Sequence, residues 1–390
     1  MVEVCIVGGG IAGLYAAYNL SWRLGLSPKG NVYVFEAKKR IGELYKSSGG
    51  IARYWLENPP LSYDKEIWEK TIVDEIREVV IYPPLHSEKY PEVRVSSSEA
   101  IGYVIDHRKL EKTLARRIVS KRSKNTEIYT RRRIRNIPSE YDYDYIIGAD
   151  GAFSVVARDT VGLPDESHMH KCLEYWFPSG DGKHRLEIYF KPYCPKGYIW
   201  VFPAKDYVKI GAGIPMSEKA ELKEILSRFL NETDYGKLGE PVAEYGGVVP
   251  TAKPLKPLQL TPKECIALIG DAGRLVNSAT GGGIHLALLS GYHVAKSIAM
   301  GGLSYYREWY RDEVYPQLER WYRIRSILTS STPEELSEII SMVGDFVGEV
   351  FTGKPVTLNP IQLLSQAIVK IATHPKTSLK VLDQLFWGAD

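Results

Sequence analysis

The chain has 390 residues, 44% of them hydrophobic, which suits one large two-part protein or two domains with a buried core. Lys and Arg number 50 against 47 Asp and Glu, so the formal charge of +3 excludes any argument for a nucleic-acid partner from charge alone. The four cysteines show no metal-site spacing, which predicts a reduced, cytoplasmic protein. No uncharged apolar run is long enough to span a bilayer, so any membrane contact is expected to be peripheral.

The N-terminal segment predicts a βαβ unit, with strands at 2–7 and 31–37 and a helix at 12–24. After the first strand, Gly8, Gly10 and Gly13 have the spacing G-x-G-x-x-G. Such glycines let the backbone turn tightly and approach a pyrophosphate at the helix N-terminus. Glu36 closes the second strand, where a carboxylate accepts hydrogen bonds from ribose hydroxyls. This pattern predicts a dinucleotide site, and a glycine-rich turn without a ligand is the alternative.

Further along the chain, a helix is predicted at 110–122 and a strand ending in a turn at 141–151. From about 171 to 213, alternating aromatic-rich segments predict an antiparallel sheet with one covered face. Residues 264–273 return to a buried strand followed by glycine, and helices are expected from Gly283 to the end. His168 and His170 have no metal-ligand partner nearby in the sequence and are expected in a surface loop.

The segment PKGYIWVFP (195–203) places aromatic residues at every second position. On a strand, Tyr198, Trp200 and Phe202 would share one face. They could fill a core or form the wall of a site for a long apolar ligand. Spacing alone leaves both interpretations open.

Two later glycine-rich turns decide the predicted cofactor by resemblance. IGADGAFS (147–154) and LIGDAG (268–273) resemble the second and third fingerprints of glutathione-reductase-like FAD proteins of the hydroxylase-type branch. The resemblance implies FAD, with Asp271 at the ribityl chain and the turn around Asp150 supporting the same region. No second G-x-G-x-x-G is present, so an external electron donor is expected, either NAD(P)H or a reduced carrier protein.

PKGYIWVFP also matches a P-x-x-Y-x-W-x-F-P pattern, and the chain thereby resembles the geranylgeranyl reductase family, including archaeal digeranylgeranylglycerophospholipid reductases. GDAGRLVNSATGGGI (270–284) is similar to another segment of that family, with Ser278 where a proline is common. In this family the aromatic strand lines a tunnel for an isoprenoid chain next to the flavin. The resemblance implies substrate contacts at Tyr198, Trp200 and Phe202, and cofactor contacts at Gly8, Gly10, Ala12, Gly13, Glu36, Ala37, Ser47, Ser48, Gly50, Arg108, Asp271, Gly282, Gly283 and Ile284. No metal site is expected.

The fold class implied is α/β: a Rossmann-type FAD-binding domain with an inserted antiparallel-sheet substrate domain and a helical C-terminal region. The predicted boundaries are 1–60, 100–160 and 262–300 for the FAD-binding domain, 61–99 and 161–261 for the substrate domain, and 301–390 for the helical region.

One turn departs from the family pattern. Where relatives carry an Arg-Cys-Gly-Glu type of turn near the flavin ring, this chain has Lys46-Ser-Ser-Gly-Gly50, so Ser47 stands at the cysteine position. A thiol is a better acid than a hydroxyl. Ser47 is therefore a candidate catalytic residue, and water held by Ser47 and Ser48 is the expected proton source.

The expected function is FAD-dependent saturation of double bonds in an isoprenoid (geranylgeranyl) chain on a lipid or related prenyl substrate. An FAD-dependent monooxygenase of an aromatic or apolar substrate is the main alternative, because it shares the FAD motifs. A non-catalytic isoprenoid carrier is the third.

Overall fold

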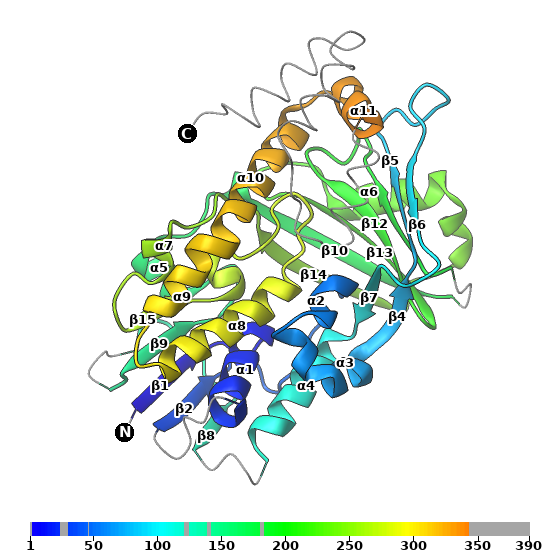
Figure 1. The fold of residues 1–390 in the computed structure, drawn as a ribbon. Helices are drawn as coiled ribbons and strands as arrows, with labels where there is room; N and C mark the ends of the chain where they lie inside the picture. The colour runs from blue at the N-terminus through cyan, green and yellow to red at the C-terminus, as the bar shows by residue number, and fades with distance from the viewer. Residues whose placement is uncertain are drawn as a thin grey trace.

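The computed structural model describes residues 2–23, 30–45, 47–120, 125–138, 142–179 and 183–342. Figure 1 shows two main sheets, with the N-terminal strands at one end of the molecule and the long helix α10 (Tyr315–Ser330) running from one sheet toward the other. Lys46 and the predicted helices of 343–390 lie outside the described residues.

The first sheet is five-stranded and fully parallel, with the apolar N-terminal strand at its centre. Its order is β15 (Ile266–Leu268), β9 (Tyr145–Gly148), β1 (Val2–Val7), β2 (Gly30–Phe35) and β8 (Thr126–Tyr129). The predicted βαβ opening is confirmed. Its helix α1 (Ile11–Tyr18) is shorter than expected, because a π-helical turn (Asn19–Arg23) continues it.

Helix α8 (Ile284–Ala299) packs against α1 through small residues. A Cβ built on Gly291 would lie 2.8 Å from the carbonyl oxygen of Ala12, so the two helix backbones approach closely. The shorter helices α4 (His107–Ile118), α5 (Val155–Thr160), α7 (Pro257–Leu260) and α9 (Ser304–Trp309) surround this unit. The buried core of the first sheet therefore joins segments that are far apart in the sequence.

The second sheet has seven strands. Its order is β14 (Ala243–Pro250), β10 (Met169–Pro178), β13 (Tyr207–Pro215), β12 (Tyr198–Ala204), β11 (Arg185–Tyr189), β5 (Glu78–Tyr82) and β6 (Val93–Ser96). All pairs are antiparallel except β5 with β11, which is parallel. The antiparallel sheet predicted from about 171 to 213 is thus confirmed by strands β10 to β13. Strands β14, β5 and β6 extend it beyond that prediction.

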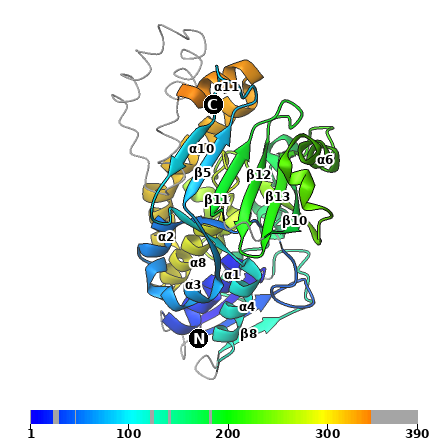
Figure 2. The same ribbon diagram turned by 90° about the vertical axis from the view of Figure 1, so that its right-hand side faces the viewer.

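Both faces of this second sheet carry apolar clusters. Helix α6 (Leu222–Glu232) covers one face, where Ile199, Val201 and Ile210 are buried. The opposite face, which we call the inner face, packs Trp200 and Ile188 against α11 (Pro333–Met342). Figure 2 shows α6 on one side of β12 and β13, with α10 and α11 on the other. The period of two in strand β12 therefore separates the aromatic residues from the aliphatic ones.

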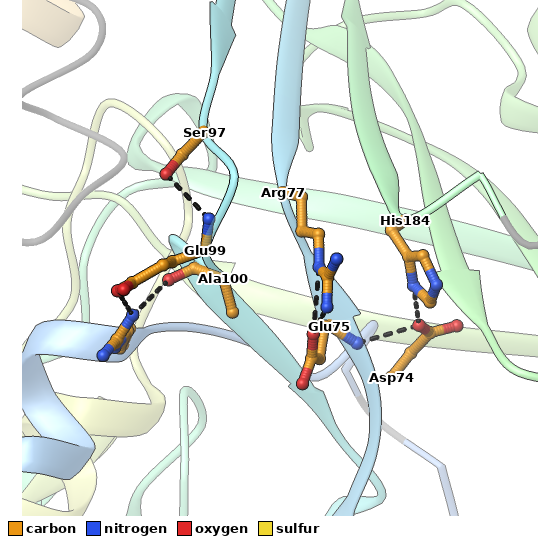
Figure 3. Close-up of polar contacts among 8 residues, drawn as sticks. Asp74, Glu75, Arg77, Ser97, Glu99, Ala100 and His184 are labelled. Atoms are coloured by element: carbon orange, nitrogen blue, oxygen red, sulfur yellow. Dashed lines mark hydrogen bonds and ion pairs between the residues drawn. The ribbon is translucent and has the colours of Figure 1, made fainter.

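A small three-stranded sheet of β3 (Gly50–Ala52), β7 (Gly102–Ile105) and β4 (Ile72–Ile76) lies between the larger sheets, flanked by α2 (Arg53–Glu57) and α3 (Lys65–Thr71). Asp74 anchors this sheet to the second one. Its carboxylate lies 2.7 Å from Nδ1 of His184 (Figure 3). It also accepts the backbone N–H of Lys205 at 2.6 Å. This contact between the two sheets is relevant to the turn at 47–50, because strand β3 of the small sheet begins at Gly50.

The predicted domain division remains a prediction. Strands of the parallel sheet all fall within 1–60, 100–160 and 262–300, and those of the seven-stranded sheet within 61–99 and 161–261. The small sheet draws strands from both sets. In the described part of the chain, no helix has the length and apolar character needed to cross a membrane.

Candidate cofactor and substrate site

The glycine-rich turn after β1 is formed by close backbone contacts. Gly8 has a φ of +114°, and a Cβ there would lie 2.3 Å from the carbonyl oxygen of Ala149. A Cβ on Gly13 would lie 2.0 Å from the carbonyl oxygen of Gly8. At Gly10 the nearest atom would be 3.9 Å away, so this residue has free space beside it. The first and third of these glycines are therefore needed by the fold itself, whereas Gly10 leaves a cradle that a ligand can approach.

Glu36 joins this turn to the end of β2. Its carboxylate accepts the backbone N–H groups of Gly9 at 2.9 Å and of Lys38 at 2.8 Å, and the residue is buried. The neighbouring Ala37 is exposed. Glu36 is thus placed beside the glycine turn, as the sequence predicts for a ribose-binding carboxylate.

The turn at 47–50 is held by hydrogen bonds. The Ser47 hydroxyl accepts the backbone N–H of Gly49 at 3.1 Å. Gly49 has a φ of +91° and lies against the carbonyl oxygen of Ile105 on β7. The Ser48 hydroxyl donates to the carboxylate of Glu174 on β10, which connects the turn to the seven-stranded sheet.

The segment 270–284 returns the chain to the same region. Gly270, with a φ of +55°, packs against Ala12 at the start of α1. A Cβ on Gly283 would lie 3.5 Å from a carboxylate oxygen of Asp271, so these two predicted residues are neighbours. Gly282 and Ile284 lie beside Gly283 at the N-terminus of α8, a position that favours anionic groups. Ala12, Asp271, Gly282, Gly283 and Ile284 are therefore brought together.

Arg108 lies at the start of α4 and faces inward. Its guanidinium lies over the ring of Tyr45, 3.5 Å from the ring centroid. Its Nε is buried and finds no acceptor among the described residues. A buried donor without an acceptor is costly, so this atom is suited to a polar group of a bound cofactor.

The aromatic row of β12 directly contacts the two turns that are predicted to hold the cofactor. Tyr198 donates its hydroxyl hydrogen to the carbonyl oxygen of Thr280 in the 277–283 segment. Phe202 lies against Gly50, where a Cβ would be 2.5 Å from the phenylalanine ring. Trp200 lies between them on the same inner face. The predicted substrate residues therefore border both turns that are predicted to hold the flavin.

A glycine allows Trp200 to reach a buried carboxylate. Gly211 on β13 pairs with Trp200 on one side and Glu174 on the other. A Cβ on Gly211 would lie 2.3 Å from the indole ring, so the missing side chain makes room for it. The Trp200 Nε1–H then donates to Glu174 at 2.9 Å, and the Trp176 Nε1–H donates to the same carboxylate at 2.8 Å.

The buried pair of Glu174 and Lys209 was missed by sequence reasoning. The Lys209 ammonium donates to the carbonyl oxygen of Ser48 at 2.8 Å and lies 4.5 Å from the ring centroid of Trp176. Burial lowers the pKa of Lys209, and Glu174 opposes that shift. The sequence did contain a signal for this pair. Glu174 on β10 and Lys209 on β13 each place a charged residue at an inward position of an aromatic-rich strand. Charged side chains are almost never fully buried unless they are paired.

These contacts make the site fit FAD. The glycine cradle, Glu36, the N-terminus of α8 and the unpartnered Nε of Arg108 supply features that a dinucleotide with a pyrophosphate and ribose groups requires. No cluster of three or more metal-ligating side chains occurs within the described ranges.

Two segments of the chain match models of known protein families. A family described as FAD dependent oxidoreductase matches residues 3–82, which include the glycine turn and Glu36. The family described as geranylgeranyl reductase catalytic domain matches residues 169–249, which include Glu174 and the aromatic row. Over this segment the chain is similar to the geranylgeranyl reductase family. It is an FAD-dependent oxidoreductase.

Whole-chain likenesses extend beyond these two segments. This flavoprotein is 28% identical, over 90% of its length and 93% of the relative, to a digeranylgeranylglycerophospholipid reductase of Methanococcus vannielii. A solved geranylgeranyl bacteriochlorophyll reductase-like protein of Thermoplasma acidophilum shares the fold, with a TM-score of 0.79, 21% identity and 98% coverage of both chains. A probable FAD-dependent monooxygenase of Pseudomonas aeruginosa shares it more distantly, with a TM-score of 0.56, 16% identity and coverage of 91% and 100%.

We predict that two glycines of the flavoprotein's first turn respond differently to an added methyl group. Gly10→Ala has room and an ordinary backbone conformation, so the FAD-free protein should keep its melting temperature. FAD binding should weaken at least tenfold, because the methyl group fills the cradle. Gly13→Ala should instead destabilise the fold by about 1–3 kcal/mol through overpacking. Calorimetry measures the stability of each variant, and flavin fluorescence titration measures its affinity for FAD. Unchanged FAD affinity in Gly10→Ala would contradict the assignment.

We also predict that Glu174→Gln loosens the turn at 47–50. An amide cannot accept all three donors, so at least one indole or hydroxyl loses its partner, at a cost of about 1–3 kcal/mol. The absorbance spectrum of bound flavin should shift, because Ser48 is released. Glu187→Gln is the matched control, since this buried glutamate bonds Tyr189 and Tyr235 in another cluster. It should lose stability without changing the spectrum. Identical spectra in both variants would oppose the prediction.

Proposed function

We propose that this flavoprotein reduces carbon–carbon double bonds of a geranylgeranyl or related isoprenoid chain carried by a lipid. The observation that carries the proposal is the contact of the aromatic row with both cofactor turns, through Phe202 at Gly50 and Tyr198 at Thr280. The name of the Methanococcus relative, a digeranylgeranylglycerophospholipid reductase, supports the same substrate class.

The chemistry of a polyprenyl chain explains the character of this wall. Such a chain has no hydrogen-bonding groups along its length, so aromatic and aliphatic surfaces are what a site can offer. The inner-face cluster continues from Trp200 to Ile188 on β11 and Leu336 on α11. An apolar chain lying along this surface would pass beside Gly50 and Gly281. Core packing and substrate contact are therefore compatible roles for Trp200.

When bound in its reduced form, FAD supplies a hydride to one carbon of the alkene. The protein's part is to hold the chain against the two turns and to deliver a proton to the other carbon. The Ser48 hydroxyl is committed to Glu174, and the Ser47 hydroxyl accepts a backbone N–H, which leaves its own hydrogen free to orient water. We propose that water beside Ser47 is the proton source.

We further propose that the reducing equivalents come from an external donor, NAD(P)H or a reduced carrier protein. The absence of a second G-x-G-x-x-G from the sequence supports this proposal. Because the substrate would be a lipid, we propose that membrane contact is peripheral. Co-flotation of the protein with vesicles of archaeal-type lipids tests the proposed membrane contact.

A single-turnover experiment tests the function. Protein loaded with FAD and reduced by dithionite should be reoxidised by geranylgeraniol or a geranylgeranyl lipid with oxygen excluded, and mass spectrometry should show products heavier by two hydrogens per bond. A saturated phytanyl compound serves as the control and should leave the flavin reduced. If reoxidation requires oxygen and the product gains an oxygen atom, the monooxygenase alternative is correct instead.

We expect Ser47→Ala to retain a measurable fraction of alkene reduction with FAD still bound, because water can be held by neighbouring groups. Ser47→Cys should be accepted, since the two side chains are similar in size. The measurement is the anaerobic rate of flavin reoxidation by the prenyl substrate. Complete loss in Ser47→Ala, with FAD retained, would mean that the hydroxyl itself is essential and that the water proposal is wrong.

A further inference from the structure

A small cavity extends from the aromatic row to the inner side of α10. Its volume is about 50 Å³. Tyr198 and Trp200 line it together with Gly281, whereas Arg325 and Ser278 contribute polar atoms. A buried water needs roughly 10–15 Å³ measured in this way, so the space corresponds to about four water positions. That is room for one small tetrahedral oxyanion.

Two residues that line this cavity each carry a buried polar atom with no hydrogen-bond partner among the described residues: Arg325 at Nε and Ser278 at Oγ. Arg325 is 6% exposed and Ser278 is 5% exposed. Buried donors without acceptors are rare in native proteins because each costs free energy. Two of them on one cavity wall indicate an acceptor that binds there.

The Arg325 guanidinium is held in place but not neutralised. Its Nη2 donates to the carbonyl oxygen of Ser167 at 2.7 Å, which fixes the side chain across from the strand that begins at Met169. No carboxylate of the described residues forms an ion pair with it. Burial lowers the pKa of Arg325, which is the mark of a desolvated cation. Such a charge favours an anion in the adjoining space.

The other ionisable side chains that line the cavity are positively charged or neutral. Lys196 lines the cavity and is paired with Glu218 at 2.7 Å. His170 contacts Thr251 Oγ1 at 2.6 Å, and burial lowers its pKa to about 4, so it is neutral at physiological pH. The expectation that His170 lies in a surface loop is wrong, because strand β10 places its ring in the cavity wall.

We propose that this cavity is an oxyanion site that binds one phosphate group through Arg325 and Ser278. Arginine supplies a planar set of donors suited to phosphate oxygens, and a hydroxyl adds a neutral donor. Because the site opens onto Tyr198 and Trp200, the phosphate is that of a prenyl phosphate whose chain follows the aromatic row. This last identification rests on the proposed function, whereas phosphate binding itself does not.

Direct binding tests the site without any reaction. Inorganic phosphate is titrated into the FAD-loaded protein, with binding followed by calorimetry and by the rise in melting temperature at constant ionic strength. Arg325→Gln should weaken binding roughly tenfold or more, and Ser278→Ala by a smaller factor. Arg320→Gln, on an exposed part of the same helix, is the matched control and should bind as the parent does. If Arg325→Gln folds poorly, Ser278→Ala still decides the question.

A pair of substrates then identifies the source of the phosphate. Geranylgeranyl phosphate should be reduced with a lower KM than geranylgeraniol, and Arg325→Gln should raise KM for the phosphate while leaving KM for the alcohol unchanged. Inorganic phosphate should compete with the first and not the second. Phosphate binding without such competition would assign the site to a free anion rather than a head group. If neither prenyl compound is reduced, the proposed function fails while the binding result stands.

The proposal is overturned if the parent protein shows no saturable phosphate binding that depends on Arg325 or Ser278. It is also overturned if Arg325→Gln and Ser278→Ala bind phosphate as tightly as the parent, which would mean that water alone occupies the cavity.

Discussion

The buried carboxylate of Glu174 is the interaction on which the arrangement of this molecule depends. It accepts hydrogen bonds from the indoles of Trp176 and Trp200 and from the hydroxyl of Ser48. Three segments are therefore tied to one charge: the aromatic row on β12, strand β10 itself and the turn at 47–50. A buried carboxylate must be satisfied by donors, so moving any one of these segments leaves a costly group without partners.

Missing side chains create the spaces that this network needs. Gly211 lets the Trp200 indole cross β13 to reach Glu174, and Gly50 lets the Phe202 ring contact the turn at 47–50. Gly8 and Gly13 bring α1 and the turn around Ala149 together in the same manner. At each of these glycines the backbone lies close to an aromatic ring or to another backbone segment. A residue with a side chain would not fit at these positions.

The fold is shared with FAD proteins of different chemistry, so it does not by itself select a reaction. The distantly related Pseudomonas protein is a probable monooxygenase with the same fold. The inner face of this chain carries an aromatic row, a carboxylate that accepts a hydrogen bond from it and, among the residues lining the small cavity, a desolvated arginine. The substrate site that we propose thus has an apolar path and one polar end.

The sequence alone determined the parts of this protein that are local in the chain. The G-x-G-x-x-G turn after an apolar strand, the position of Glu36 and the shared face of Tyr198, Trp200 and Phe202 follow from backbone geometry within one or two elements, and the structure places each as predicted. The family pattern supplied the cofactor. The end of α1 differs from the predicted end of the helix, because the π-helical turn that follows it has no distinct sequence signal.

Only the tertiary structure decided which distant residues meet. Nothing in the sequence pairs Ser48 with Glu174, or brings Ser278 and Arg325 to one cavity, because strand order and helix packing set those contacts. The parallel pairing of β5 with β11 was equally invisible, since it joins strands about a hundred residues apart. A charged residue on a buried strand stabilises the fold only when other groups form hydrogen bonds or ion pairs with it. The packing of the whole chain brings those groups together, and local sequence patterns do not encode that packing.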